Sequence, residues 1–212
     1  MDIHNPDDQL ASLKAWWQQY GTALIAGVAI GLLLLGGLNY WKQYRAERAE
    51  AASVLYEKLL DSLQQGRNDE AGKTAATLVA DYAATPYAGK AALLAARLRF
   101  EEQDLAGARQ QLEWAVENAR EAAVQHSARI RLGHLLLELK EFDAALALTA
   151  ARDPGGFESE YAELKGDALL AKGDRDGART AYQTALDKLP PQSPYQRLLA
   201  MKRDNLGPGA AP

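Results

Sequence analysis

The chain has 212 residues, of which 48% are hydrophobic and 25% charged, and it carries a net charge of −4 with no cysteine. No run of basic residues occurs, which argues against nucleic acid as a partner, and the lack of cysteine excludes disulfide bonds and thiolate chemistry. Beyond residue 45 the composition is dominated by Ala, Leu, Glu, Gln, Arg and Lys, which are strong helix formers. We therefore expect an all-α protein.

The first predicted element is an apolar segment, residues 22–41, that contains no charged side chain. A membrane core about 30 Å thick requires roughly 20 helical residues at about 1.5 Å each. Aromatic residues, which favour the two membrane interfaces, flank the segment on both sides: Trp16, Trp17, Tyr20, Tyr40, Trp41 and Tyr44. The sequence therefore predicts a single transmembrane helix over residues 20–41, lying in the lipid bilayer after a leader of residues 1–19.

The composition of the leader argues against a cleaved signal peptide. It carries Asp2, Asp7 and Asp8 against Lys14, whereas a signal peptide opens with net positive charge. The apolar segment is also longer than the roughly 7–15 residues of a signal-peptide core. We therefore expect an uncleaved anchor.

The basic residues around the anchor predict an orientation that places the C-terminal part in the cytoplasm. Lys14 alone precedes the apolar segment within about 15 residues, whereas Lys42, Arg45 and Arg48 follow it, and basic residues favour the cytoplasmic side. The rule is weaker for long translocated domains, so the flanking charges leave the orientation open.

Small residues recur along the anchor at Ala23, Gly27 and Gly31. Such a stripe allows a second transmembrane helix, from another copy of the chain or from a different membrane protein, to approach closely at Gly27 and Gly31. Glycine is also common in membrane helices in general, so the stripe has a purely compositional interpretation as well.

A repeated pattern follows the anchor. Ala71, Ala108, Ala145 and Ala178 each stand after a turn and before small or apolar residues, and they recur along the chain at nearly equal intervals. The interval is close to the period of about 34 residues that is typical of tetratricopeptide repeats.

The fourth copy of the pattern is the clearest. Gly166 precedes Ala178 in this copy, at the point where we expect the first helix of the repeat to pass close to the second. Pro190 is expected to end that second helix, because proline lacks an N–H and clashes with the preceding turn. We expect Gly133 to take the part of Gly166 in the third copy, and Ala96 to take it in the second.

The predicted helices form a tetratricopeptide-like solenoid over residues 42–206, followed by a disordered tail over residues 207–212. One long helix is expected to run from the anchor to about residue 63. The others are expected at 70–83, 87–102, 105–119, 124–139, 142–151, 159–172, 175–188 and 193–205. A helix pair cannot bury its apolar face alone, so we expect the core to lie between stacked pairs.

No residue pattern indicates catalysis. The histidines His4, His126 and His134 lack the spacing of a metal site, and we expect them on the surface or in a single hydrogen bond. Asp174 and Asp176 lie in a predicted turn, where we expect carboxylates to cap the next helix, because the full ligand set of a calcium loop is missing. We therefore expect no enzyme activity, no cofactor and no metal site.

The inward positions of the repeat predict a partner-binding surface. Solenoids of this kind bind through the concave face that is lined by the first helix of each pair. The predicted partner-binding residues on this face are Leu93, Arg97, Phe100, Ile130, His134 and Leu137, with acidic positions at Glu160, Glu163 and Asp167 towards the far end. The alternative is that several of the apolar residues belong to the core between repeats.

Two segments carry a resemblance to a known family. TPYAGKAALLAARL (residues 85–98) and AELKGDALLAKGDRDGARTAYQTAL (residues 162–186), together with the acidic leader and the basic exit from the anchor, resemble YfgM-type proteins, the ancillary subunits of the bacterial Sec translocon. The resemblance covers nearly the whole chain, and its most specific part is the last repeat.

The resemblance implies a location and a set of partners. It implies a single-pass protein of the bacterial inner membrane, with a cytoplasmic N-terminus and a periplasmic repeat domain. It also implies association with SecYEG and with a membrane-anchored periplasmic chaperone of the prolyl-isomerase type, to which translocated polypeptides would be passed. The alternative is a scaffold of the same architecture, in the envelope or the cytoplasm, that serves another membrane complex.

Overall fold

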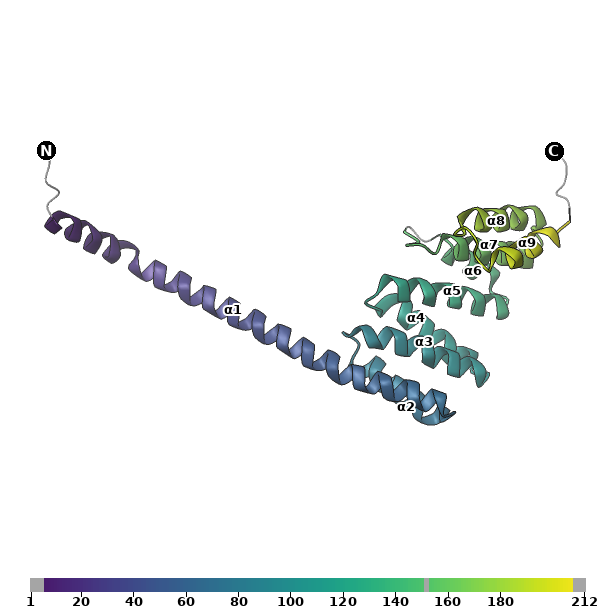
Figure 1. Ribbon diagram of the computed structural model, residues 1–212, viewed down its shortest axis with the longest axis horizontal. Helices are drawn as coiled ribbons and strands as arrows, with labels where there is room; N and C mark the ends of the chain where they lie inside the picture. The colour runs from purple at the N-terminus through teal and green to yellow at the C-terminus, as the bar shows by residue number, and fades with distance from the viewer. Residues whose placement is uncertain (1–5, 151–152, 208–212) are drawn as a thin grey trace. The chain divides into compact units, whose positions relative to one another are not determined.

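The computed structural model describes residues 6–150 and 153–207, and every regular element within them is an α-helix (Figure 1). The helices are α1 (Pro6–Gln64), α2 (Asn68–Asp81), α3 (Pro86–Glu101), α4 (Leu105–Asn118), α5 (Ala122–Glu138), α6 (Phe142–Leu148), α7 (Glu158–Ala171), α8 (Arg175–Lys188) and α9 (Gln196–Asp204). The all-α prediction is confirmed, and each expected helix is found close to its expected place. The start of the predicted leader, residues 1–5, and the predicted tail beyond Gly207 lie outside the described residues.

Two helices are shorter than the sequence predicts. Helix α6 ends at Leu148, and just past its end the Thr149 hydroxyl donates to the Leu146 carbonyl at 2.8 Å, which satisfies one of the last carbonyls of the helix. Helix α9 begins at Gln196 rather than at residue 193, since Ser193 is held in a turn in which its N–H donates to the Pro190 carbonyl at 3.2 Å.

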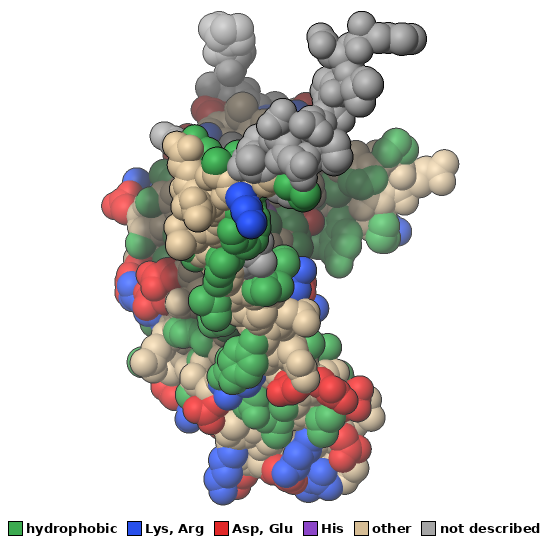
Figure 2. Space-filling model, turned by 90° about the vertical axis from the view of Figure 1, so that its left-hand side faces the viewer, with side chains coloured by type: hydrophobic (Ala, Val, Ile, Leu, Met, Phe, Trp, Pro, Cys, Tyr) green, Lys and Arg blue, Asp and Glu red, His purple; other side chains and the backbone are tan. Residues whose placement is uncertain are grey.

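The chain divides into two units after Arg48. The first contains most of α1, and from Leu24 onward this helix includes a window of mean hydropathy 1.8, none of which is buried within the protein. Figure 2, which faces the N-terminal end of α1, shows hydrophobic side chains uncovered on the surface. By length and composition, α1 can cross a membrane, as the sequence predicts.

The second unit begins at Ala49 and consists of the end of α1 and the helices α2–α9, each of the latter packed against the next in the chain (Figure 1). In addition, α3 contacts α5, and α5 contacts α7. These three are the first helices of successive repeats, so they form one layer of the solenoid. The predicted tetratricopeptide-like architecture is confirmed.

The repeats are packed by pairs of side chains whose sizes are complementary. A Cβ on Gly166 would lie 2.5 Å from Cε1 of Tyr182, so only glycine leaves room for the buried phenol ring. In the second repeat the two corresponding positions hold Ala96 and Leu112, and both are buried. Where the first helix carries a smaller residue, the second carries a larger one.

The third repeat departs from this arrangement, and the expected part of Gly133 is wrong. The three atoms nearest to a Cβ on Gly133 all belong to Leu164, which lies on α7 in the next repeat, and the first of them would be 2.3 Å away. The reason is the shortness of α6: the residue of the third repeat that corresponds to Tyr182 is Thr149, which lies past the end of that helix. Leu164, which is fully buried, fills the space instead.

Aspartates cap two of the second helices, as predicted for one of them. The Asp174 carboxylate accepts a hydrogen bond from the Gly177 N–H at 2.9 Å at the start of α8, and Asp104 does the same for Gly107 at the start of α4. Asp176 lies in the first turn of α8, where its negative charge interacts favourably with the positive end of the helix dipole, but its side chain does not cap the helix.

Candidate functional site

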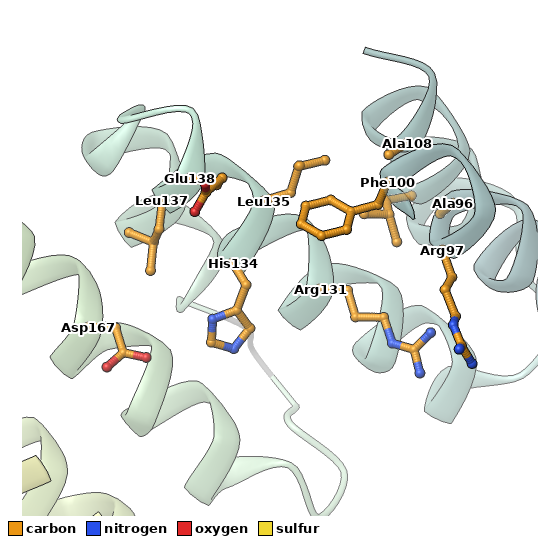
Figure 3. Close-up of a pocket in the computed structure, with 11 residues that line it drawn as sticks. Ala96, Arg97, Phe100, Ala108, Arg131, His134, Leu135, Leu137, Glu138 and Asp167 are labelled. Atoms are coloured by element: carbon orange, nitrogen blue, oxygen red, sulfur yellow. The ribbon is translucent and has the colours of Figure 1, made fainter. Parts of the chain in front are cut away.

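A cavity of about 690 Å³ opens between the first helices of the middle repeats (Figure 3). We call it the groove cavity. Its lining comes from α3, α4, α5 and α7: Ala96, Arg97, Phe100, Ala108, Leu112, Arg131, His134, Leu135, Leu137, Glu138 and Asp167. The contacts of α5 with α3 and with α7 bring together residues from three successive repeats.

The floor of the groove cavity is apolar. Ala96, Ala108, Leu112 and Leu135 are all buried members of the largest core cluster, so the cavity sits directly on the packed interior of the domain. Phe100 stands above this floor and is 44% exposed. Such an exposed ring beside a concave apolar surface is typical of an interaction site.

One repeat position supplies three polar residues of the lining. Arg97, His134 and Asp167 follow one another at the same intervals as the repeat alanines Ala108, Ala145 and Ala178. The position therefore changes from cationic on α3, through imidazole on α5, to anionic on α7.

Two further charged residues of the lining were not identified from the sequence. Arg131 and Glu138 lie on α5, and together with His134 and Leu135 they follow the i, i+3, i+4, i+7 pattern of a single helix face. That periodicity could have revealed them. Within the described part of the chain, the side chains of Arg131, His134 and Glu138 make no hydrogen bond or ion pair to another residue.

Asp167, in contrast, is already engaged. Lys202 of α9 donates to both oxygens of its carboxylate at 2.9 Å and to Glu163 at 2.7 Å, and the Tyr182 hydroxyl donates to Asp167 at 2.7 Å. Burial lowers the pKa of Lys202, but the hydrogen bonds from Glu163 and Asp167 outweigh it and raise that pKa above its ordinary value. Burial, followed by the bond to Asp167, likewise raises the pKa of Tyr182.

This cluster pairs two of the acidic residues that the sequence predicts at the far end. Of the three acidic positions predicted there, Glu163 and Asp167 are both paired with Lys202, while Glu160 is exposed. Leu199 of the same helix is buried against Ala162 and Ala185, which fixes α9 on the last repeat. The sequence predicts the helix α9 but gives no signal that its lysine would pair with two carboxylates of α7.

Four of the six predicted partner-binding residues line the groove cavity, namely Arg97, Phe100, His134 and Leu137. The other two, Leu93 and Ile130, are half-buried and lie outside the lining, and Leu93 packs against the core cluster. That the cavity binds a partner stays a prediction.

The other candidate residues from the sequence have simple environments. A Cβ on Gly27 or Gly31 would meet nothing within 4 Å, so no contact within the chain requires glycine there. His126 is buried and its Nδ1 shares a hydrogen bond of 2.8 Å with the Tyr161 hydroxyl, which confirms the single hydrogen bond expected for it. His4 lies outside the described residues, and among those described no group of three His, Asp or Glu side chains could hold a metal ion.

Similarity to solved structures extends to the fold. A MamA fragment from Desulfovibrio magneticus RS-1 matches with a TM-score of 0.52 at 15% identity, covering 73% of this chain and 92% of the fragment. A second MamA structure, a double mutant, matches with a TM-score of 0.53 at 16% identity, covering 73% of this chain and 86% of its own. At such identities the likeness supports the helical repeat architecture alone.

Sequence comparisons identify the family. The model of the tetratricopeptide repeat-like domain matches residues 14–208. The ancillary SecYEG translocon subunit of Escherichia coli K12 is 30% identical over 209 residues, covering 97% of this chain and 99% of that protein. The protein of the same name from Neisseria gonorrhoeae is 31% identical over 208 residues, covering 97% of this chain and 100% of its own length. The chain therefore belongs to the tetratricopeptide repeat-like family of ancillary SecYEG translocon subunits.

Proposed function

We propose that this chain is a membrane-anchored scaffold that associates with the SecYEG channel through its anchor and presents the groove cavity to partner polypeptides. The observation that carries the proposal is the end-to-end match to relatives named as translocon subunits, which includes both the apolar helix and the repeats. The exposed Phe100 on an apolar floor supplies a surface on which a scaffold of this kind can act.

The finer role is to pass translocated polypeptides to a membrane-anchored periplasmic chaperone of the prolyl-isomerase type. This role requires the repeat domain to lie in the periplasm, with the N-terminus in the cytoplasm of a cell whose inner membrane holds the anchor. An alkaline phosphatase fused after Pro212 should then be active, and a fluorescent protein that matures only in the cytoplasm should be dark at the same position.

A second candidate is a scaffold in the cytoplasm that serves another membrane complex. The observation that favours it is the basic exit from the anchor, where the Arg45 guanidinium lies 5.1 Å from the centre of the Trp41 ring and Arg48 lies 6.0 Å from that of Tyr44. An excess of basic residues in the flank of a transmembrane helix favours the cytoplasmic side for that flank. An inactive phosphatase fusion with a bright fluorescent one would support this candidate and refute the periplasmic role.

The part of the groove cavity in partner binding is tested by Phe100→Glu. Because the ring is 44% exposed, a glutamate there reaches water, and the melting temperature should change by no more than a few degrees. Recovery from detergent extracts of the partners other than SecYEG, which the anchor is proposed to hold, is measured by mass spectrometry and should fall to background. Leu198→Glu is the matched control: Leu198 is 47% exposed on α9, outside the cavity, so its variant should keep the partners. Full recovery with a folded Phe100→Glu variant would show that the cavity is not the binding surface.

A further inference from the structure

The rim of the groove cavity carries basic side chains on one side and acidic side chains on the other. In Figure 3 the side chains of Arg97 and Arg131 extend to the same side of the cavity, whereas Glu138 and Asp167 lie on the opposite side. Arg97 is paired with Glu101, to which its Nε donates at 2.7 Å, and Asp167 is paired with Lys202. Among the charged residues of the lining, those left without a partner are therefore Arg131 on one side and Glu138 on the other, with the apolar floor between them.

The spacing of Arg131 and Glu138 determines how long a bound segment must be to reach both charges. Arg131 and Glu138 lie about two helical turns apart on α5, which corresponds to about 10 Å along the helix axis. An extended polypeptide in the polyproline II conformation covers that distance in about three residues, since each residue advances about 3.1 Å. With about three residues per turn, the first and fourth side chains also lie on the same side of such a segment. A groove of this kind accepts side chains in pockets while the rim charges select and orient the segment.

We propose that the groove cavity takes a short extended segment of a partner polypeptide in which an acidic residue pairs with Arg131, an apolar side chain enters beside Phe100, and a basic residue three positions from the acid pairs with Glu138. The assignment rests on the proposed scaffold function and names the chemistry of its ligand. Rim charges of both signs fit a polypeptide segment better than an amphiphile with one headgroup, such as a fatty acid. Exposed Arg131 contributes selectivity, and the apolar side chain contributes most of the affinity.

The test uses full-length protein in lipid nanodiscs and fluorescein-labelled peptides, with binding measured by fluorescence anisotropy. The first probe carries Glu-Phe-Leu-Lys between Gly-Ser flanks, the second Lys-Phe-Leu-Lys, and the third Glu-Ala-Ala-Lys. We expect the first to bind about five- to tenfold more tightly than the second, a difference of about 1–1.4 kcal/mol, and the third to show no measurable binding. Equal affinity of the first two peptides would overturn the proposal.

A charge exchange in the protein tests the assignment to Arg131. Arg131→Glu should reverse the preference, so that the Lys-Phe-Leu-Lys peptide binds more tightly than Glu-Phe-Leu-Lys. Arg120→Glu removes a comparable exposed arginine between α4 and α5, outside the cavity lining, and should leave the preference unchanged. A preference that survives Arg131→Glu, or that Arg120→Glu abolishes equally, would refute the assignment.

A parallel measurement separates this proposal from the function on which it rests. SecYEG recovered with the full-length protein from detergent extracts reports on the translocon role and does not depend on peptide preference. If the full-length protein recovers no SecYEG but still prefers the Glu-Phe-Leu-Lys peptide, the translocon role alone would be refuted. If the full-length protein recovers SecYEG but binds the Glu-Phe-Leu-Lys and Lys-Phe-Leu-Lys peptides equally, the proposed ligand chemistry alone would be refuted.

Discussion

Replacing Gly166 with alanine tests the size complementarity that packs the last repeat. The new Cβ would lie 2.5 and 2.6 Å from two ring carbons of Tyr182, distances that real Cβ atoms do not adopt. The ring has little freedom to move away, because it is 1% exposed and its hydroxyl is bonded to Asp167. The substitution must therefore displace either the ring or the helix.

The magnitude follows from two opposing effects. Alanine is favoured over glycine inside a helix by about 0.5–1 kcal/mol, whereas overpacking of a filled core costs about 1–3 kcal/mol. We expect a net loss of about 1–2 kcal/mol, which corresponds to a fall of roughly 2–8 °C in the melting temperature of a domain of this size. Gly72→Ala is the matched control: a Cβ there meets nothing within 4 Å on α2, so the melting temperature should rise by about 2–4 °C.

Thermal unfolding of the full-length protein in mild detergent, followed by far-ultraviolet circular dichroism, measures both variants. A double-mutant cycle with Tyr182→Leu adds a sharper criterion, since Ala and Leu at these positions recreate the pair Ala96–Leu112 of the second repeat. The alanine should cost less in the Tyr182→Leu background, with a coupling of about 1–2 kcal/mol. If Gly166→Ala behaves like Gly72→Ala, or if the two changes are additive, the packing argument is wrong.

Three further predictions address other parts of the molecule. Lys202→Met should lower the free energy of unfolding by about 1–3 kcal/mol at neutral pH, since two carboxylates lose a charged donor. Because the folded-state pKa of Lys202 is raised, this stabilisation is complete below the ordinary lysine pKa of 10.5 and is lost as the pH rises through the raised value, so wild type and variant should converge in alkaline urea titrations. A fragment of residues 45–212 should give a helical spectrum and one cooperative melt without the anchor; a largely unfolded spectrum would place the domain boundary elsewhere. Replacing Gly27 and Gly31 with leucine in the full-length protein should leave the melting temperature of the repeat domain unchanged but lower the recovery of SecYEG. Unaltered recovery would show that the small residues of the anchor reflect composition alone.

The repeats could be predicted because their signals are local and periodic. The spacing of Ala108, Ala145 and Ala178 places the turns, and the pattern of the fourth copy identifies Gly166 as the point of contact between its helices. Gly133 has the same residue type at the same repeat position, yet its neighbour is Leu164. The difference depends on where α6 ends, because Thr149 lies just past that end.

The groove could be predicted in part for the same reason. Four of the inward repeat positions, Arg97, Phe100, His134 and Leu137, line the groove cavity, since these positions follow from helix periodicity; that they bind a partner stays a prediction. The sequence predicts the acidic positions on α7 but not the pairing of Asp167 with Lys202, which reaches this carboxylate from a helix much further along the chain. Contacts between helices that are distant in the sequence produce no repeating pattern of residues, so a single sequence gives no signal from which they could be predicted.

The insertion of Leu164 beneath Gly133 has a consequence for how the domain opens. In an ideal solenoid each repeat contacts its neighbours through an interface that can separate while the repeat itself stays folded. Here the third repeat borrows a core residue from the fourth, and the fourth is held in turn by the end of α9, where the Leu206 carbonyl accepts a hydrogen bond of 3.1 Å from Arg175. Amide protons of α5 and α7 should therefore exchange with solvent in a single opening event. The two helices α5 and α7, which supply part of the lining of the groove cavity, would then fold and unfold together.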